Sequence, residues 1–255
     1  MKSNQNIYFA SDFHLGVPTY EKSREREILI CNWLDEIKND ASAVFLVGDL
    51  FDFWFEYKYT IPKGYIRFLG KLAELKDMGI DLYLYTGNHD MWMFDYLEKE
   101  LGLEIIRDSK EFTFNGKNFL IGHGDGLGPG DHGYKFIKKI FANKFCQWML
   151  ARLHPNFAFG LAQHWSRKSR ESQDHEAEKY LGDNEEWLFQ YCEEYLEKHN
   201  SQIDYFVFGH RHLPIDVPVK NSRYINLGEW LHHKTYAVFD GENISIKKFQ
   251  AIFDS

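Results

Sequence analysis

Five short motifs rich in aspartate, asparagine and histidine each come directly after an apolar run of the chain. The motifs are Asp12-Phe13-His14, Gly48-Asp49-Leu50-Phe51-Asp52, Gly87-Asn88-His89-Asp90, Gly122-His123-Gly124-Asp125 and Gly209-His210-Arg211-His212. They contain five of the 12 histidines in the chain. Carboxylate, amide and neutral imidazole groups bind manganese, iron, zinc and similar divalent ions. The motifs therefore predict a metal site, provided that the fold brings them together.

The type of these side chains favours a site for two hard ions. Two ions about 3.5 to 4 Å apart bind a phosphoryl group between them and generate hydroxide at neutral pH, and they need a carboxylate that contacts both. Asp49, in the middle of the set, is the candidate for that carboxylate. A site for softer metals would use cysteine, but Cys31, Cys146 and Cys192 are far apart and form no CxxC pair.

The apolar runs before the motifs have the length and composition of buried strands. They cover residues 7–11, 43–47, 82–86, 119–121 and 205–208. Between the early runs, apolar residues recur at helical spacing over residues 21–38, 65–78 and 91–101. Strands that alternate with helices predict an α/β fold. Ligands of open α/β sheets bind at the carboxyl ends of the strands, so we expect all five motifs to face one crevice.

The end of the chain shows a different pattern. Residues 224–227, 235–239 and 244–249 are strand-like and close together, and Asp240-Gly241 is a turn sequence between the last two. We expect a second, partly antiparallel sheet from these segments.

Length and composition predict a single folded domain over residues 1–255. The chain has 30 Lys and Arg against 38 Asp and Glu, and this net charge of −8 argues against a nucleic-acid partner. No apolar run reaches the roughly 18 to 20 residues of a membrane-spanning helix, and no signal peptide is recognisable, so we expect a cytoplasmic protein. Nothing in the sequence indicates an obligate protein partner.

One basic segment lies in this acidic chain. From His132 to Arg170 there are eight Lys or Arg and no Asp or Glu. Residues 135–153 have the spacing of an amphipathic helix with a basic polar face, and a second, acidic helix is expected over residues 174–198. We therefore expect residues 130–198 to form a helical cap inserted in the domain.

The basic segment has three interpretations. Scattered Lys and Arg usually form a solvated helix face. Alternatively, Arg167, Lys168 and Arg170 bind phosphate groups, because guanidinium groups match phosphate oxygens. The third interpretation is docking on an anionic membrane, because the helix carries aromatic and aliphatic residues opposite its charges.

The order of the motifs resembles the calcineurin-like metallophosphoesterase superfamily. The patterns DxH, GDxxD, GNHD, GHGD and GHxH follow one another at predicted strand ends. The resemblance implies two mixed β-sheets flanked by helices and two divalent ions, with manganese expected and zinc or iron as alternatives. One ion would be bound by Asp12, His14, Asp49 and His212. The other would be bound by Asp49, Asn88, His123 and His210.

Nearly the whole chain is also similar to the UDP-2,3-diacylglucosamine pyrophosphohydrolases of lipid A biosynthesis, a family within this superfamily. The similarity is carried by residues 48–54, by Gly122-His123-Gly124-Asp125 with Asp131 and Tyr134, by the basic helical insertion, and by residues 209–214 and 227–232. It implies a two-metal hydrolase that cleaves the diphosphate of a nucleotide lipid. It also implies that the hydrolase acts at the anionic inner-membrane surface of a Gram-negative bacterium.

This similarity assigns catalytic roles to His89, over the phosphate, and to Asp52. It assigns substrate binding to Asn88, His89, Asp131, Tyr134, Arg167, Lys168 and Arg170. His89 stands where that family carries Arg, and Asp52 where it carries Glu. A structural alternative for His89 is a hydrogen bond to Asp52 or Asp90 that orients its loop. Alternatives for the whole protein are a phosphoesterase of a soluble nucleotide or a phosphoprotein, and a non-catalytic scaffold.

Overall fold

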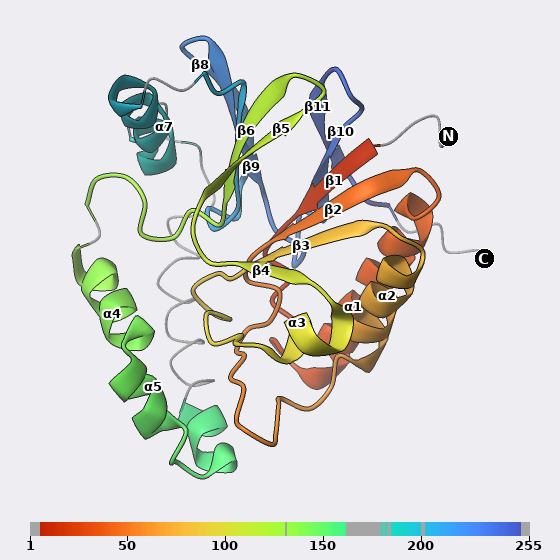
Figure 1. Cartoon of the computed structure of the whole chain (residues 1–255), viewed down its shortest axis with the longest axis vertical. Coiled ribbons are helices and arrows are strands. Elements are labelled where there is room, and N and C mark those ends of the chain that lie inside the picture. The colour runs from red at the N-terminus through yellow and green to blue at the C-terminus, as the bar shows by residue number, and fades with distance from the viewer. Residues whose placement is uncertain are drawn as a thin grey trace.

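Two mixed β-sheets face each other at the centre of the molecule (Figure 1). The computed structural model describes residues 6–130, 132–161, 180, 182, 185–199 and 202–250. The first sheet has the strand order β11-β10-β1-β2-β3-β4. Its strands are β1 (Asn6–Ala10), β2 (Ala41–Val47), β3 (Asp81–Tyr85), β4 (Glu104–Ile106), β10 (Thr235–Phe239) and β11 (Ile244–Lys248). Strands β1 to β4 run parallel, whereas β10 and β11 are antiparallel to their neighbours.

The second sheet has five strands in the order β5-β6-β7-β9-β8. They are β5 (Lys110–Phe114), β6 (Lys117–Gly122), β7 (Tyr205–Phe208), β8 (Pro214–Val219) and β9 (Ser222–Leu227). The inner strands β6, β7 and β9 run parallel, and β5 and β8 close the two edges in antiparallel pairs. Both sheets are therefore mixed, as the predicted α/β fold requires.

The layer between the sheets is built from every second residue of the strands, because successive side chains point to opposite faces. Ile7 and Phe9 of β1 point into this layer, and Phe9 stacks on Phe45 of β2 and Phe119 of β6. Tyr8 points to the opposite face of the first sheet, where it packs among helix residues. This alternation fixes which face of each strand meets the partner sheet.

Helices cover the outer faces of both sheets (Figure 1). Helices α1 (Tyr20–Ile37), α2 (Ile66–Asp77) and α3 (Tyr96–Leu101) pack on the first sheet. Helix α7 (Trp187–Lys198) packs on the second sheet. Helices α4 (His132–Ala142) and α5 (Lys144–Leu150) lie apart from the sheets, at the lower left of Figure 1. The division into one domain with residues 130–198 as a cap stays a prediction.

Two predicted helices differ from those observed. The segment at residues 91–101 is helical only from Tyr96. The helix predicted over residues 135–153 is divided at Asn143, whose side chain accepts hydrogen bonds from the backbone N–H groups of Phe145 and Cys146 and so begins a second helix. The acidic helix predicted over residues 174–198 is observed as α7 (Trp187–Lys198), and residues 174–179, 181, 183 and 184 lie outside the described residues.

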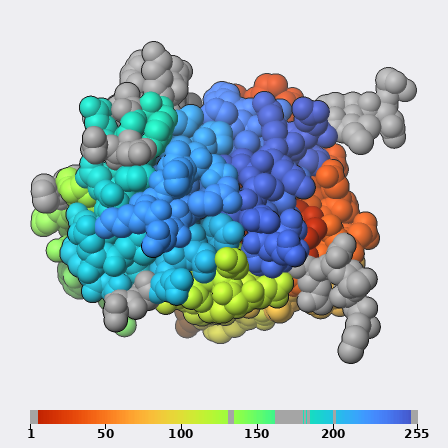
Figure 2. All heavy atoms as spheres, turned by 90° about the horizontal axis from the view of Figure 1, so that it is seen from above, coloured from red at the N-terminus to blue at the C-terminus, as the bar shows by residue number. Residues whose placement is uncertain are grey.

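The strands at the end of the chain divide between the two sheets, which corrects the expectation that they form one. Strand β9 joins the second sheet, whereas the β10–β11 hairpin extends the first. Figure 2 shows these blue C-terminal residues covering most of one face, with the yellow-green β5–β6 hairpin along its lower edge. Within the described part of the chain, no helix has the length and apolar character needed to cross a membrane.

Candidate metal centre

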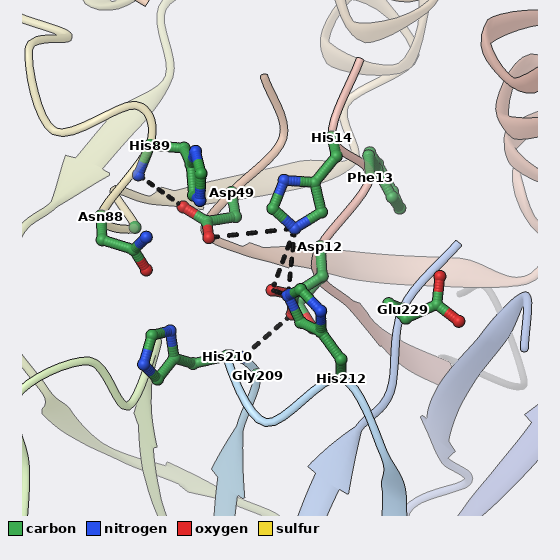
Figure 3. Close-up of polar contacts among 12 residues, drawn as sticks. Asp12, Phe13, His14, Asp49, Asn88, His89, Gly209, His210, His212 and Glu229 are labelled. Carbon is green, nitrogen blue, oxygen red and sulfur yellow. Dashed lines mark hydrogen bonds and ion pairs between the residues drawn. The ribbon is translucent and has the colours of Figure 1, made fainter. Parts of the chain in front are cut away.

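The five motifs lie together at the carboxyl ends of β1, β2, β3, β6 and β7 (Figure 3). Positive φ angles between 43° and 65° occur at Asp12, His14, Asp49, His210 and His212. Side-chain-bearing residues rarely adopt this conformation, and it persists only where the surrounding structure enforces it, which is frequent at functional sites. The fold therefore holds these five candidates in positions that a free loop would avoid.

The first group of side chains comprises Asp12, His14, Asp49 and His212, whose ligand atoms lie within 4.8 Å of one another. Nε2 of His14 lies 3.1 Å from Nε2 of His212, 3.8 Å from Oδ1 of Asp12 and 4.0 Å from Oδ2 of Asp49. Nε2 of His212 lies 3.2 Å from the same Asp12 oxygen. These atoms point toward one another from both sheets (Figure 3).

The second group comprises Asp49, His123 and His210. Nε2 of His123 lies 3.3 Å from Oδ2 of Asp49 and 3.3 Å from Oδ1 of Asn88. The ring centres of His123 and His210 are 5.2 Å apart. Asp49 belongs to both groups, which is the position required of a carboxylate that contacts two ions.

The electrostatics of these buried groups are set by their mutual charges. Burial would raise the pKa of Asp49, but the neighbouring imidazoles of His123 and His89 lower it well below its usual range. Burial would lower the pKa of His123, but the Asp49 carboxylate raises it to about 10. Burial and the charge on His123 lower the pKa of His210 to about 4. A cation bound here would compete with protons on these imidazoles, because only a deprotonated ring nitrogen binds a metal.

The donor set fits divalent cations. The buried Oδ1 atom of Asp12 forms no hydrogen bond of good geometry with any described residue, although Nε2 of His212 lies 3.2 Å away, and a buried carboxylate is costly unless it is paired. Metal–nitrogen distances of about 2.0 to 2.1 Å place two imidazole nitrogens on one ion roughly 3 Å apart. The 3.1 Å separation of the His14 and His212 nitrogens matches this spacing.

Comparison with known proteins also indicates a site for divalent cations. Residues 6–214 match the family described as calcineurin-like phosphoesterase. The chain belongs to the calcineurin-like phosphoesterase family. This membership, together with the histidine and aspartate groups, confirms the expected divalent metal binding and a metal-dependent phosphohydrolase.

Several relatives within the calcineurin-like phosphoesterases are similar to this chain over most of its length. The UDP-2,3-diacylglucosamine hydrolase of Porphyromonas gingivalis is 36% identical over 258 residues, which cover 96% of this chain and 97% of that protein. The enzyme of the same name from Haemophilus influenzae is 25% identical, covering 91% of this chain and 93% of that protein. The one from Actinobacillus succinogenes is 26% identical, covering 88% and 91%.

Contacts behind the phosphoesterase site orient its ligands. Nδ1 of His123 lies 2.8 Å from the carbonyl oxygen of Val47, so that Nδ1 carries the proton and Nε2 faces Asp49. Oδ2 of Asp12 accepts a hydrogen bond from the backbone N–H of His210 at 3.0 Å. This bond links the loop after β1 to the loop after β7, and hence the two sheets.

The buried carboxylate of Asp90 joins two of the ligand loops. It accepts hydrogen bonds from the backbone N–H groups of Leu50 at 2.8 Å and Gly87 at 2.7 Å. These bonds hold the loop that carries Asp49 against the loop that carries Asn88. A side chain at position 87 would overlap the Asp49 carboxylate, so the close approach requires glycine.

His89 and Asp52, the predicted catalytic residues, lie beside the first group. The backbone N–H of His89 donates to Oδ1 of Asp49 at 2.9 Å, and its Nδ1 lies 3.1 Å from the carbonyl oxygen of Asp52. Oδ1 of Asp52 lies 3.8 Å from Nδ1 of His14 and 3.9 Å from Nδ1 of His89. Asp52 is therefore behind His14, on the side away from the Nε2 atom that faces the other ligands.

Arg26 is a supporting residue that the sequence motifs do not reveal. It is buried in α1, and its guanidinium group donates to the carbonyl oxygens of Phe13 at 2.6 Å, His14 at 2.5 Å and Val17 at 2.6 Å. These bonds fix the loop that carries Asp12 and His14. The detectable signal is a charged residue on the buried stripe of a helix, four residues before Ile30.

Arg211, between two candidate ligands, forms a second support that was not predicted. Its Nε lies 3.0 Å from Oε2 of Glu186, and both side chains are buried. Glu186 precedes α7, so the pair ties the loop after β7 to that helix.

The structure describes few of the predicted substrate-binding residues of the 130–198 segment. Asp131, Arg167, Lys168 and Arg170 lie outside the described residues, and for Tyr134 only its position in α4 is described. Two other basic residues of the cap contact protein oxygens. Nζ of Lys138 lies 2.6 Å from the Asp125 carboxylate. Nζ of Lys135 donates to the carbonyl of Gly128 at 2.6 Å. Lys135 and Lys138 therefore contact other parts of the protein, and they are not simply members of a solvated helix face.

Proposed function

We propose that this phosphoesterase hydrolyses the diphosphate of UDP-2,3-diacylglucosamine to UMP and 2,3-diacylglucosamine 1-phosphate. The observation that carries the proposal is the position of Asp49, which is shared by two groups of candidate ligands. The similarity to relatives named UDP-2,3-diacylglucosamine hydrolase over nearly their full length supports the substrate. The complete set of candidate ligands argues against a non-catalytic scaffold.

In this proposal, Asp12, His14, Asp49 and His212 would hold one ion. Asp49, Asn88, His123 and His210 would hold the other. Manganese is the expected metal, and zinc or iron are alternatives with the same ligand preference. When bound, the ions would polarise the phosphoryl oxygens and lower the pKa of a water molecule, so that hydroxide is available at neutral pH.

The residues of the chain position the substrate for displacement at phosphorus. A new P–O bond forms from water, and the bond from phosphorus to the diphosphate bridging oxygen breaks. The leaving group is a phosphate monoester that is stable as an anion near neutral pH, so no side chain has to protonate it. We assign His89 to the phosphoryl oxygens, because Nδ1 is held by the Asp52 carbonyl and the opposite ring nitrogen can donate when protonated.

Asp52 is proposed to position the two neighbouring histidines. Its Oδ1 atom lies between Nδ1 of His14 and Nδ1 of His89, at 3.8 and 3.9 Å. A carboxylate behind a ligating imidazole fixes the orientation of the ring and raises its basicity.

The cap is proposed to bind the acyl chains or rest on the membrane. On the described part of α4 and α5, Phe136, Phe145 and Trp148 are 63%, 65% and 52% exposed. Lys139, Lys144 and Arg152 lie in the same segment. Apolar side chains beside cations suit both acyl chains and an anionic lipid surface. We therefore propose that the enzyme works at the cytoplasmic surface of the inner membrane.

Comparing the diacylated UDP-sugar with its deacylated counterpart tests the substrate. Burial of acyl chains contributes about 0.8 kcal/mol per methylene, so kcat/KM should fall by orders of magnitude when the chains are removed. Equal kcat/KM values for the two substrates would refute the lipid assignment and favour a soluble nucleotide or a phosphoprotein as the substrate.

A further inference from the structure

A large cavity lies beside the metal centre, on the side of α1 and α2. It has a volume of about 1290 Å³ and is lined by the loop before α1, the connection from β2 to α2, and residues 155–160 at the end of the described cap. Gly16, Asp52 and Phe53 are among its lining residues. Phe53 packs against Phe159 at 5.2 Å between ring centres, so core and cap meet at this cavity.

The cavity is directly connected to the phosphoryl site. Asp52 lines it, and the same carboxylate lies 3.8 Å from Nδ1 of His14 and 3.9 Å from Nδ1 of His89. Gly16 lines it two residues after His14. A ligand bound in the cavity would therefore lie next to a phosphoryl group held at the metal centre.

The start of α2 and the connection before it carry positive charge that no described residue neutralises. Lys63 and Arg67 line the cavity, are exposed, and make no ion pair with any residue in the described part of the chain. Glu27 also lines the cavity, but its carboxylate is occupied by Arg24 at 2.5 Å and by the backbone N–H of Arg67 at 2.9 Å. The cavity therefore attracts anions.

Aromatic and amide groups accompany these cations. Phe53, Tyr65 and Phe159 line the cavity, and Asn156 lies at the cap side. Aromatic side chains stack with nucleobases, and an amide can both donate to and accept from a base edge. Val17, Ile61 and Ile66 complete the lining. The cations match the phosphate of a nucleotide, and the rings and the amide match its base.

We infer that this cavity binds the nucleoside monophosphate half of the substrate, with Lys63 and Arg67 as specificity-determining residues. The inference rests on the proposed function, because a substrate with a nucleotide half and a lipid half must extend from the metal centre in two directions. The nucleotide occupies the charged cavity between α1, α2 and the end of the cap. The acyl chains extend toward the apolar residues of α4 and α5.

Binding of UMP to the manganese-loaded protein tests the inference by calorimetry. The double variant Lys63→Glu, Arg67→Glu reverses both charges, and the Kd for UMP should rise roughly tenfold. Lys58→Glu is the matched control, because Lys58 is an exposed cation of the same connection that does not line the cavity. Its Kd should stay within about twofold of the wild type. Thermal unfolding of all variants should be unchanged, since the substituted residues are exposed.

Two outcomes would overturn the inference. One is an unchanged Kd for UMP in the double variant. The other is weaker binding of 2,3-diacylglucosamine 1-phosphate with unchanged binding of UMP, which would place the lipid half in the cavity. Failure of the proposed function is distinguishable: wild-type protein would then bind UMP with the predicted charge dependence but leave UDP-2,3-diacylglucosamine intact.

Discussion

Nε2 of His14 and Nε2 of His212 lie 3.1 Å apart, although the two residues are separated by 198 positions in the sequence. His14 follows β1 of the first sheet, and His212 follows β7 of the second. A cation bound between these nitrogens would join the two sheets at their carboxyl ends. The site is therefore expected to contribute to stability as well as to chemistry.

Adding manganese to protein that a chelator has stripped of metal should raise its melting temperature. At manganese concentrations about 100 times the Kd, binding stabilises the folded state by about 2.7 kcal/mol, or roughly 5 to 10 °C for a chain of this size. His212→Ala should lose most of this shift. The control is His199→Ala, an exposed histidine directly after the C-terminal end of α7, whose shift should equal that of the wild type. An undiminished shift in His212→Ala would exclude His212 as a ligand.

Replacing Arg26 should loosen the loop that carries Asp12 and His14. Arg26→Met removes hydrogen bonds to three carbonyl oxygens, and the unfolding free energy should fall by about 2 to 4 kcal/mol. The affinity for manganese should fall as well, because His14 is no longer held. Lys22→Met, on the exposed face of the same helix, should change the unfolding free energy by less than about 0.5 kcal/mol. Wild-type metal affinity in Arg26→Met would contradict a positioning role.

His89→Ala should separate turnover from metal binding. The proposed phosphate contact stabilises charge that develops during the reaction, so kcat should fall roughly 10- to 100-fold. The content of bound metal, measured on the same preparation, should equal that of the wild type. Loss of metal would instead show that the hydrogen bond from the backbone N–H of His89 to Asp49 depends on the His89 side chain. The role of His89 would then be structural.

The contact between α1 and α2 should weaken in acid. Burial raises the pKa of Asp35, but its hydrogen bonds with Lys38 and Lys71 lower it below 3.8 overall. Lys71 and Lys38 lower the pKa of Glu74 below 4.5. A carboxylate with a lowered folded-state pKa stabilises the protein above its unfolded pKa, and this contribution is lost as the pH falls. Below about pH 4.5, the unfolding free energy of Lys71→Gln should therefore decline less steeply than that of the wild type. Equal slopes would show that these pairs contribute nothing.

The sequence predicts the centre of the fold better than its edges. Strands β1, β2, β3, β6 and β7 are continuous apolar runs because both of their faces are buried. Strands β4, β5 and β8 are short or partly exposed, and none of them forms such a run. The β10–β11 hairpin resembles the strands of either sheet, and only tertiary pairing with β1 decides its place.

The candidate ligands were predictable because they follow strands in recognisable motifs. Their supports were not, because Arg26 and the Arg211–Glu186 pair act through backbone carbonyls and a distant segment. No local pattern records a contact between residues 25 positions apart, as in that pair. The cavity at Lys63 and Arg67 likewise arises only when α1, α2 and the cap come together.

The most direct test of the two-metal hydrolase is the release of UMP from UDP-2,3-diacylglucosamine by wild-type protein and Asp49→Ala in the presence of manganese. Because Asp49 is shared by both ligand groups, the variant should remain folded, lose tight binding of two ions per chain, and release UMP roughly 10³-fold more slowly or worse. Asp108→Ala, an exposed carboxylate outside the site, should retain wild-type turnover. Two tightly bound ions and normal release of UMP in Asp49→Ala would contradict the account.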